Sequence, residues 1–234
     1  FRQSKNVKSY ENYFEILCKK NLTYNCQCSR KKIISLNKSD SNEIIYNNYC
    51  REKQHPASNS SSVRIIANFT STNFLDRAQG FQAHKSDSLT GDFIIKRSDQ
   101  IYAYQLTAVI DDELQSVTDI VRGSDLLNST IKQHYINTLL NFPEKNFMHI
   151  PVASINNRKL SKGNGDKLNT KNWSLVLIEG LKFLKQKIQK DMEDAKPEEI
   201  LKYASKNWDI KPLQNHNSIE LDSNQRSFVD NIHT

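Results

Sequence analysis

The stretch 117–140 constrains the fold of this 234-residue chain more than any other part of the sequence. It begins with Val117-Thr118-Asp119-Ile120-Val121, which is typical of a short strand and runs directly into Arg122-Gly123. Ser129 is a suitable N-cap for a helix over residues 130–140. A strand that leads into a helix predicts an α/β domain. One face of that helix would carry Ile131, Tyr135 and Leu139.

A short basic loop follows at Lys159-Leu160-Ser161-Lys162-Gly163. Two lysines three residues apart, with a serine between them, suit the binding of a triphosphate whose charge moves during adenylate formation. The same residues would also suit a solvated surface turn, and the short motif alone does not choose between the two. The neighbouring Gly163-Asn164-Gly165 is too small a glycine cluster to form a P-loop.

Periodicity predicts further elements around these two stretches. Residues 102–114 fit either a helix or a buried strand. After Trp173 the pattern predicts helices only, one of which starts with Pro197 at its first position. The tail, residues 214–234, is polar and is expected to pack loosely. One apolar stripe in the helical part consists of Ile178, Leu181, Leu184 and Ile188. The remaining expected elements are a helix over 10–20 and strands over 63–69 and 93–97.

All four cysteines lie in the first quarter of the chain, at Cys18, Cys26, Cys28 and Cys50. Clustered cysteines in a chain without an export signal favour metal binding over disulfides. Zinc prefers four tetrahedral ligands, and the phenolate oxygen of Tyr46 is a candidate for the fourth. The spacing leaves open the alternative of three ordinary buried cysteines. We interpret Cys18 as a core residue because it lies on the apolar face of the first expected helix.

Charge and hydropathy narrow the class of protein. The formal net charge is +7 and the pI is about 9.1, which favours a polyanionic partner such as nucleic acid but would also serve solubility. No apolar run is long enough to span a bilayer, and no hydrophobic signal region is present at the N-terminus. We therefore expect a cytoplasmic protein with no membrane partner. Separately, we expect a monomer. The chain starts at Phe1 without an initiator Met, so we expect it to be cut or incomplete there.

Two further side chains are candidates for ligand binding. Arg122 stands at a strand end, where an arginine can grip a carboxylate or phosphate with two hydrogen bonds. The alternative is a surface ion pair with Asp119 or Asp125. Tyr104 stands among apolar residues, and from its surroundings alone it is better interpreted as a core aromatic with a satisfied hydroxyl.

Several blocks in this region resemble the catalytic core of glutamyl-tRNA synthetases, which are class I enzymes. The lysine loop resembles the second signature motif of that class, and all the blocks occur in the same order as in the family. The matching blocks are Gly91-Asp92-Phe93, Lys96-Arg97-Ser98-Asp99, Ala103-Tyr104-Gln105-Leu106, Val109-Ile110-Asp111-Asp112, residues 117–133 and His149-Ile150-Pro151-Val152. The resemblance covers residues 1 to about 190.

Within this family the chain is most similar to the glutamyl-Q tRNA(Asp) synthetase group. The segment Cys26-x-Cys28, followed by Tyr46-x3-Cys50, resembles the zinc pattern of that group. The 71 residues that follow Gly163 are also too few for the separate anticodon-binding domain of a full-length glutamyl-tRNA synthetase.

The resemblance implies a two-step reaction. Glutamate and ATP, the latter with Mg²⁺, would give glutamyl-adenylate, and the glutamyl group would then pass to the queuosine base of tRNA(Asp). Tyr104 and Arg122 would bind glutamate. Lys162 would contact ATP, and Lys159 would help to neutralise the phosphates in the transition state. A structural zinc ion would be held by Cys26, Cys28, Tyr46 and Cys50.

The resemblance also predicts the domain organisation. Residues 1–170 would form a Rossmann-like catalytic core that includes a zinc-binding segment over 18–55, and residues 171–234 would form a helical C-terminal region. The His-x-Gly-His-type motif of class I synthetases is not found, so the N-terminal part of the core is expected to be missing. Two alternatives follow: the core of a glutamyl-tRNA synthetase that charges tRNA(Glu), or a degenerate, non-catalytic tRNA-binding remnant.

Overall fold

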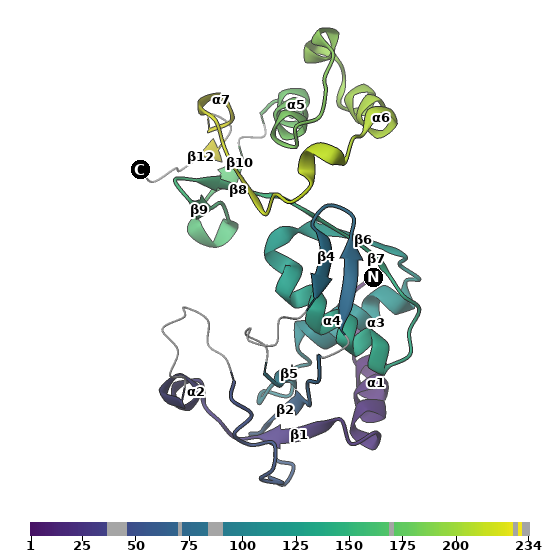
Figure 1. Ribbon diagram of the computed structural model, residues 1–234, viewed down its shortest axis with the longest axis vertical. Coiled ribbons are helices and arrows are strands. Elements are labelled where there is room, and N and C mark those ends of the chain that lie inside the picture. Colours follow the sequence, from purple (N-terminus) through teal and green to yellow (C-terminus); the bar gives the residue numbers. More distant parts are fainter. Residues whose placement is uncertain (37–45, 70–71, 84–90, 169–170, 227–228, 231–234) are drawn as a thin grey trace. The chain divides into compact units, whose positions relative to one another are not determined.

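The computed structural model describes residues 1–36, 46–69, 72–83, 91–168, 171–226 and 229–230 (Figure 1). They belong to two compact units, each assembled from separate segments of the chain. The first unit comprises residues 1–74, 83–118 and 128–145, and the second comprises residues 75–82, 119–127 and 146–234. The predicted domain boundary between residues 170 and 171 stays a prediction.

An antiparallel three-stranded sheet forms the centre of the first unit. The strand order is β1-β2-β5, with Tyr24 opposite Arg64 and Ile65 opposite Phe93. This register brings Cys26, the last residue of β1, to the edge of the sheet opposite Ser62. The strands are β1 (Thr23–Cys26), β2 (Ser62–Ile65) and β5 (Phe93–Lys96), and the helices are α1 (Val7–Lys19), α2 (Arg30–Leu36), α3 (Tyr104–Leu114) and most of α4 (Leu127–Leu139).

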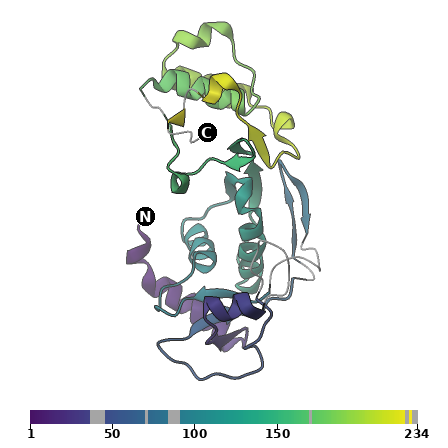
Figure 2. The ribbon, with the colours of Figure 1, turned by 90° about the vertical axis from the view of Figure 1, so that its left-hand side faces the viewer.

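Amphipathic helices supply much of the core of the first unit. Tyr10 and Leu17 are both buried on one face of α1, which packs against α3 (Figures 1 and 2). Leu106 and Ile110, four residues apart on α3, are fully buried. The Tyr10 hydroxyl donates a hydrogen bond of 2.6 Å to Asp111, and burial together with this bond raises the pKa of Tyr10. This packing resolves the segment 102–114 as a helix.

The second unit is built around parallel strands. In its larger sheet the order is β4-β3-β7-β6, and β6 runs parallel to β7 with Asp119 opposite Asn146 and Gly123 opposite Ile150. A smaller sheet has the order β11-β8-β9, and a third is the pair β10-β12. The strands are β3 (Asn73–Asp76), β4 (Gly80–Ala83), β6 (Asp119–Gly123), β7 (Asn146–Ile150), β8 (Val152–Ile155), β9 (Arg158–Lys159), β10 (Lys167–Leu168), β11 (Ser218–Glu220) and β12 (Val229–Asp230); the helices are α5 (Trp173–Phe183), α6 (Pro197–Asn207) and α7 (Ser223–Arg226).

Short 3-10 turns complete the described elements. They are η1 (Gln3–Lys5), η2 (Ser124–Leu126), η3 (Lys162–Asn164), η4 (Lys190–Asp194) and η5 (Lys211–Leu213). The turn η2 leads directly into α4, which therefore begins at Leu127 instead of Thr130. Ser129 lies inside the helix and is not its N-cap, and its hydroxyl accepts a hydrogen bond of 3.2 Å from Gln105.

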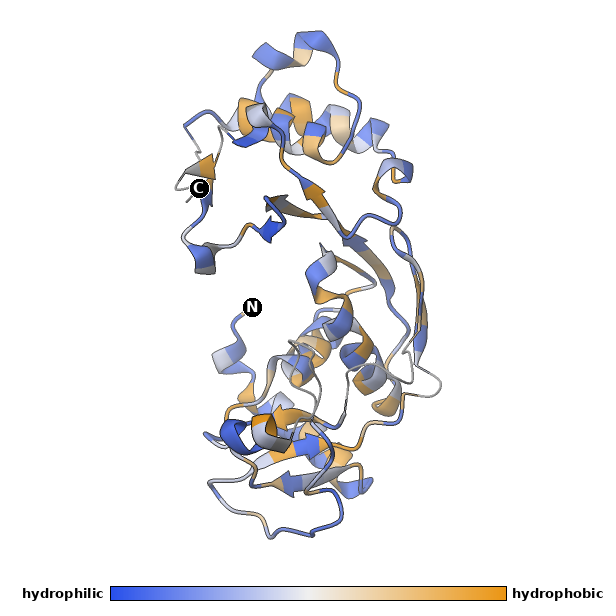
Figure 3. Cartoon of the chain, turned by 60° about the vertical axis from the view of Figure 1, so that its left-hand side comes forward, coloured by the Kyte–Doolittle hydropathy of each residue, from blue (hydrophilic) through white to orange (hydrophobic). Residues whose placement is uncertain are grey.

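The C-terminal stretch agrees with the prediction in part. Helices α5 and α6 are present, Pro197 occupies the first turn of α6, and Ile178 and Ile200 are buried between the two helices. The apolar character of α5 is visible in Figure 3. However, α5 ends at Phe183, and Lys185 has a positive φ of 52°, so the predicted stripe does not continue along one helix.

The tail is better packed than the sequence indicated. Strand β11 pairs in parallel with β8, with Ile219 opposite Ala153, and Leu213 and Leu221 are buried. The expectation of helices only and of a loosely packed tail was therefore wrong. A three-residue strand is too short for periodicity to reveal it, and its partner β8 lies some sixty residues earlier in the chain. No helix in the described part of the chain is long and apolar enough to cross a membrane.

Candidate active-site loop and metal centre

The lysine loop follows a tight hairpin in the second unit. Strands β8 and β9 pair with Ser154 opposite Lys159, and the connection is made by Asn156 and Asn157, whose φ values are 51° and 60°. Asparagine tolerates this left-handed backbone better than most residues, so the local sequence favours the hairpin. The chain then enters the turn η3, which starts at Lys162.

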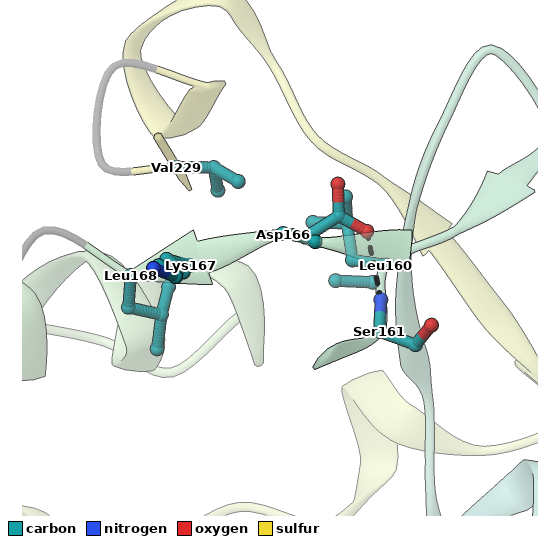
Figure 4. Close-up of a pocket in the computed structure, with 8 residues that line it drawn as sticks. Leu160, Ser161, Asp166, Lys167, Leu168 and Val229 are labelled. Carbon is teal, nitrogen blue, oxygen red and sulfur yellow. Dashed lines mark hydrogen bonds between the residues drawn. The ribbon is translucent and has the colours of Figure 1, made fainter. Parts of the chain in front are cut away.

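A carboxylate closes the base of this loop. Asp166 accepts two hydrogen bonds of 2.9 Å from the guanidinium of Arg158. It accepts a third, also of 2.9 Å, from the backbone N–H of Ser161 (Figure 4). The carboxylate is 4% exposed. Beside it, a cavity of about 720 Å³ is lined mainly by apolar side chains, including Leu160 and Leu168. Sequence reasoning missed Asp166; its only signal was an acidic residue eight positions after an arginine.

Lys159, at the start of the motif, contacts the turn that follows the strand carrying Arg122. Lys159 forms an ion pair of 2.5 Å with Asp125, a residue of η2 directly after β6. Gly123 leaves room for this arrangement, since a Cβ atom there would lie 2.4 Å from the Asp125 carboxylate. The segment 119–127 of the first stretch and the lysine loop therefore lie close together in the second unit.

The remaining predicted ligand residues have different surroundings. Arg122 lies on β6, in register with His149 of β7, and is partly buried. Of the two acidic residues considered as its partners, Asp119 forms an ion pair with Arg77, at 2.9 Å, and Asp125 pairs with Lys159. Tyr104 belongs to the first unit, where it begins α3.

The Tyr104 side chain is 51% exposed, so it is not the core aromatic that its surroundings in the sequence indicated. It lines a cavity of about 450 Å³ together with Tyr10 and Tyr102. Its position at a helix start explains the difference, because the first residue of α3 can point away from the buried face that Leu106 and Ile110 form.

A buried Asp–His pair lies one strand away from Arg122. The Asp76 carboxylate accepts a hydrogen bond of 2.6 Å from Nδ1 of His149, and neither side chain is exposed. It also accepts hydrogen bonds of 2.8–3.1 Å from the backbone N–H groups of Ala78, Gln79 and His149. Burial raises the pKa of Asp76, but these hydrogen bonds outweigh it and hold the pKa below its ordinary value. The pair fixes β3 against β7.

The cysteines of the first unit form the predicted cluster. The Sγ atoms of Cys26, Cys28 and Cys50 all lie within 4.8 Å of one another, and those of Cys28 and Cys50 are 3.5 Å apart. The Tyr46 oxygen lies 3.4 Å from Sγ of Cys26 and accepts a hydrogen bond of 2.8 Å from the backbone N–H of Cys50. Cys18 lies outside the cluster and accepts a hydrogen bond from Thr23. Part of the segment between Cys28 and Tyr46, residues 37–45, lies outside the described residues.

These distances fit a tetrahedral metal ion. With Zn–S bonds of about 2.3 Å and a Zn–O bond of about 2.0 Å, neighbouring ligand atoms lie about 3.8 Å (S···S) and about 3.5 Å (S···O) apart. Burial raises the pKa of the Cys28 thiol to about 11, assisted by its hydrogen bond to Cys50. Burial also raises the pKa of Cys26, but hydrogen bonds with Tyr46 and Arg64 outweigh it and lower the pKa to about 7. The three cysteines can therefore hold a metal ion.

The Asp166 contacts give a first prediction. In an Asp166→Ala variant, the Ser161 N–H and the Arg158 guanidinium lose their acceptor, and the loop should open more often. Trypsin should then cleave after Lys159 or Lys162 about ten-fold faster, since one buried hydrogen-bonding group is worth about 1–3 kcal/mol. Timed digestion with mass spectrometry would measure this rate. An Asp191→Ala variant, changed at an exposed residue, should behave as the wild type, and an unchanged rate in Asp166→Ala would contradict the assignment.

Comparisons with known proteins identify the family of this chain. The family model for the catalytic domain of class I tRNA synthetases (E and Q) matches residues 1–222. A glutamyl-Q tRNA(Asp) synthetase of Pseudomonas syringae pv. tomato is 34% identical over 222 residues, which covers 94% of this chain and 72% of the relative. A protein of the same name from Ectopseudomonas mendocina is 35% identical over 211 residues, covering 89% and 69%.

Solved structures show the same fold. A glutamate-tRNA synthetase from Elizabethkingia anophelis aligns with a TM-score of 0.69 at 15% identity. A glutamate tRNA ligase from Elizabethkingia meningosepticum, in complex with its amino acid, aligns with a TM-score of 0.67 at the same identity. Each match covers 96% of this chain and 52% of the solved chain, so this chain spans about half the length of those proteins. The predicted class I catalytic core is thereby confirmed. The chain belongs to the class I tRNA synthetases (E and Q), a family of ligases in which its curated relatives are named glutamyl-Q tRNA(Asp) synthetase.

Proposed function

We propose that this protein activates glutamate with ATP and transfers the glutamyl group to the queuosine base in the anticodon of tRNA(Asp). The observation that supports this most directly is the 34% identity, over 94% of the chain, to a relative named for that activity. The reaction needs ATP, which class I synthetases use, together with Mg²⁺. We place it in the cytoplasm, with the tRNA that it modifies, and carried out by a monomer.

The residues of the second unit support the ATP side of this proposal. In our proposal Lys162 contacts ATP, and Lys159 neutralises charge that develops on the leaving pyrophosphate. The ion pair with Asp125 holds Lys159 near β6 until a more highly charged partner, the triphosphate, arrives. Arg122 binds a carboxylate of glutamate, as a planar guanidinium can with two hydrogen bonds. Tyr104, exposed at the start of α3 in the first unit, is the other residue that we propose for glutamate binding, on the family resemblance alone.

Glutamate-dependent exchange between ATP and pyrophosphate, measured on the full gene product without tRNA, tests the first step. We expect exchange with glutamate and none with aspartate. The second step is tested by offering queuosine-containing tRNA(Asp) and unmodified tRNA(Asp), of which only the first should accept labelled glutamate. Charging of the 3′ end of tRNA(Glu) would instead identify an ordinary glutamyl-tRNA synthetase. RNA binding without exchange would identify a non-catalytic remnant.

We also propose that Cys26, Cys28, Tyr46 and Cys50 hold one structural zinc ion. Replacing Cys50 with serine is expected to reduce the zinc content of purified protein from about one ion per chain to near zero, because a site with three remaining ligands binds zinc poorly. Elemental analysis would measure the content. The matched control is Cys18→Ser, which changes a cysteine outside the cluster and should keep its zinc. Equal zinc content in the two variants would refute this ligand set.

A further inference from the structure

Arg64 is a buried cation beside the cysteine cluster. It lies on β2, the central strand of its sheet, and is 4% exposed. Its guanidinium carbon lies 3.6 Å from the centroid of the Tyr46 ring, and its Nη1 donates a hydrogen bond of 2.8 Å to the backbone carbonyl of Asp92. Among the described residues, its buried Nε–H has no hydrogen-bond partner. A buried donor without an acceptor is costly, so this N–H is available to an acceptor of the neighbouring cluster.

The sheet register brings Arg64 to the face that carries Cys26. Tyr24 is directly opposite Arg64, and Cys26 follows two residues later on the same face of β1. Cys26, Cys28 and Arg64 also line one cavity of about 820 Å³. The guanidinium therefore stacks on the Tyr46 ring and lies on the face of the sheet that carries Cys26.

The backbone around Asp92 fixes Arg64 in this place. The buried Asp92 carboxylate accepts hydrogen bonds from Tyr24, at 2.7 Å, and from Arg51, the residue that follows Cys50. Gly91 packs so closely that a Cβ atom there would lie 2.0 Å from the carbonyl oxygen of Tyr46. The segment 91–92 thus joins the ligand segment 46–51 to the strand that carries Arg64.

The positive charge of Arg64 would offset the negative charge of the cluster when it holds a metal ion. Three thiolates and one divalent cation leave one net negative charge in a buried site, or two if Tyr46 binds as the phenolate, and an uncompensated buried charge is strongly unfavourable. One guanidinium cancels one of these charges. It also offers an N–H to a thiolate, the kind of outer-shell hydrogen bond that orients metal ligands.

We propose that Arg64 is an integral part of the metal centre. Its cation balances the thiolates, its Nε–H is donated to the metal-bound thiolate of Cys26, and its stacked guanidinium holds the Tyr46 ring in position as the fourth ligand. This inference rests on the proposed metal site. Arg64 would bind no metal itself, and the spacing of the cysteines does not reveal its role.

Two variants and one control test the role of Arg64. Arg64→Met keeps the bulk and removes the charge, and Arg64→Lys keeps the charge but loses the planar stack. The control, Arg97→Met, removes an exposed arginine that pairs with Asp99 at one end of β5. Reduced protein is loaded with Co²⁺, whose sulfur-to-metal and d–d absorption bands report thiolate ligation and tetrahedral geometry. The release of Zn²⁺ to a chromogenic chelator is timed separately.

We expect Arg64→Met to release Zn²⁺ at least about ten-fold faster than the wild type and to show altered Co²⁺ bands, with smaller changes in Arg64→Lys. Arg97→Met should match the wild type. The inference is overturned if Arg64→Met gives the wild-type Co²⁺ spectrum and releases Zn²⁺ within about two-fold of the wild-type rate. If Arg64→Met does not fold by circular dichroism, the same criteria are applied to Arg64→Lys. Failure of the wild type to bind either metal would refute the metal site itself.

Discussion

Replacing Asp76 with alanine is expected to lower the free energy of unfolding by about 3–5 kcal/mol, because the variant leaves His149 and three buried backbone N–H groups without their shared acceptor. The carboxylate is fully buried and accepts four hydrogen bonds, of which the one from His149 is 2.6 Å long. Urea denaturation of both proteins at neutral pH would give the difference. The matched control is Asp119→Ala, which breaks a half-exposed ion pair with Arg77 and should cost no more than about 1 kcal/mol.

The same carboxylate predicts a pH dependence. Because the pKa of Asp76 is lower in the folded protein than in the unfolded chain, its contribution to stability is fully present above the unfolded value of about 4. It is lost as the pH falls through the folded-state pKa. The difference in unfolding free energy between wild type and Asp76→Ala should therefore shrink in acid. A difference that stays constant down to the lowest pH at which the protein folds would contradict the role of the ionised carboxylate.

Replacing Lys162 with alanine is expected to slow glutamate-dependent ATP–pyrophosphate exchange by about 100-fold or more. In our proposal its ammonium group contacts the triphosphate and shares with Lys159 the charge that develops there, and one such donor contributes about 3–4 kcal/mol to the transition state. The measurement is the maximal exchange rate at saturating glutamate and ATP. Lys162→Arg keeps the charge and should recover part of the rate.

Lys167→Ala is the matched control for this prediction. Lys167 is an exposed lysine of β10, close in sequence to the loop and outside its motif, and its removal should leave the exchange rate within about two-fold of the wild type. Equal losses in the two variants would show that the general positive charge of the region matters and the motif does not. A full rate in Lys162→Ala would remove this lysine from the proposed chemistry.

The sequence predicted the strands, helices and metal ligands of the site better than the buried residues that contact them. The strand before Arg122, the helix after it and the cysteine cluster could be recognised because each depends on a few neighbouring residues or on ligand chemistry. Asp166 and Arg64 could not. An acidic residue in a turn and an arginine in a strand look like surface residues until the fold shows that both are buried against specific partners.

The neighbouring elements explain the other differences. Strand β11 exists because β8 offers it a parallel partner, and α4 begins early because the turn η2 precedes it. Tyr104 is exposed because it stands at the first position of α3. In each case a neighbour that is not visible in the local pattern decides the outcome.

The division of each unit into separate chain segments has a consequence for how the protein folds. The chain passes back and forth between the units, so neither can be excised as one continuous piece. Bonds such as those from Lys20 to Leu139 and from Gln3 to Asp111 join residues 119 and 108 positions apart. A native structure with such a high contact order is expected to fold slowly and only after most of the chain has left the ribosome. Partial products of translation would then depend on chaperones for protection.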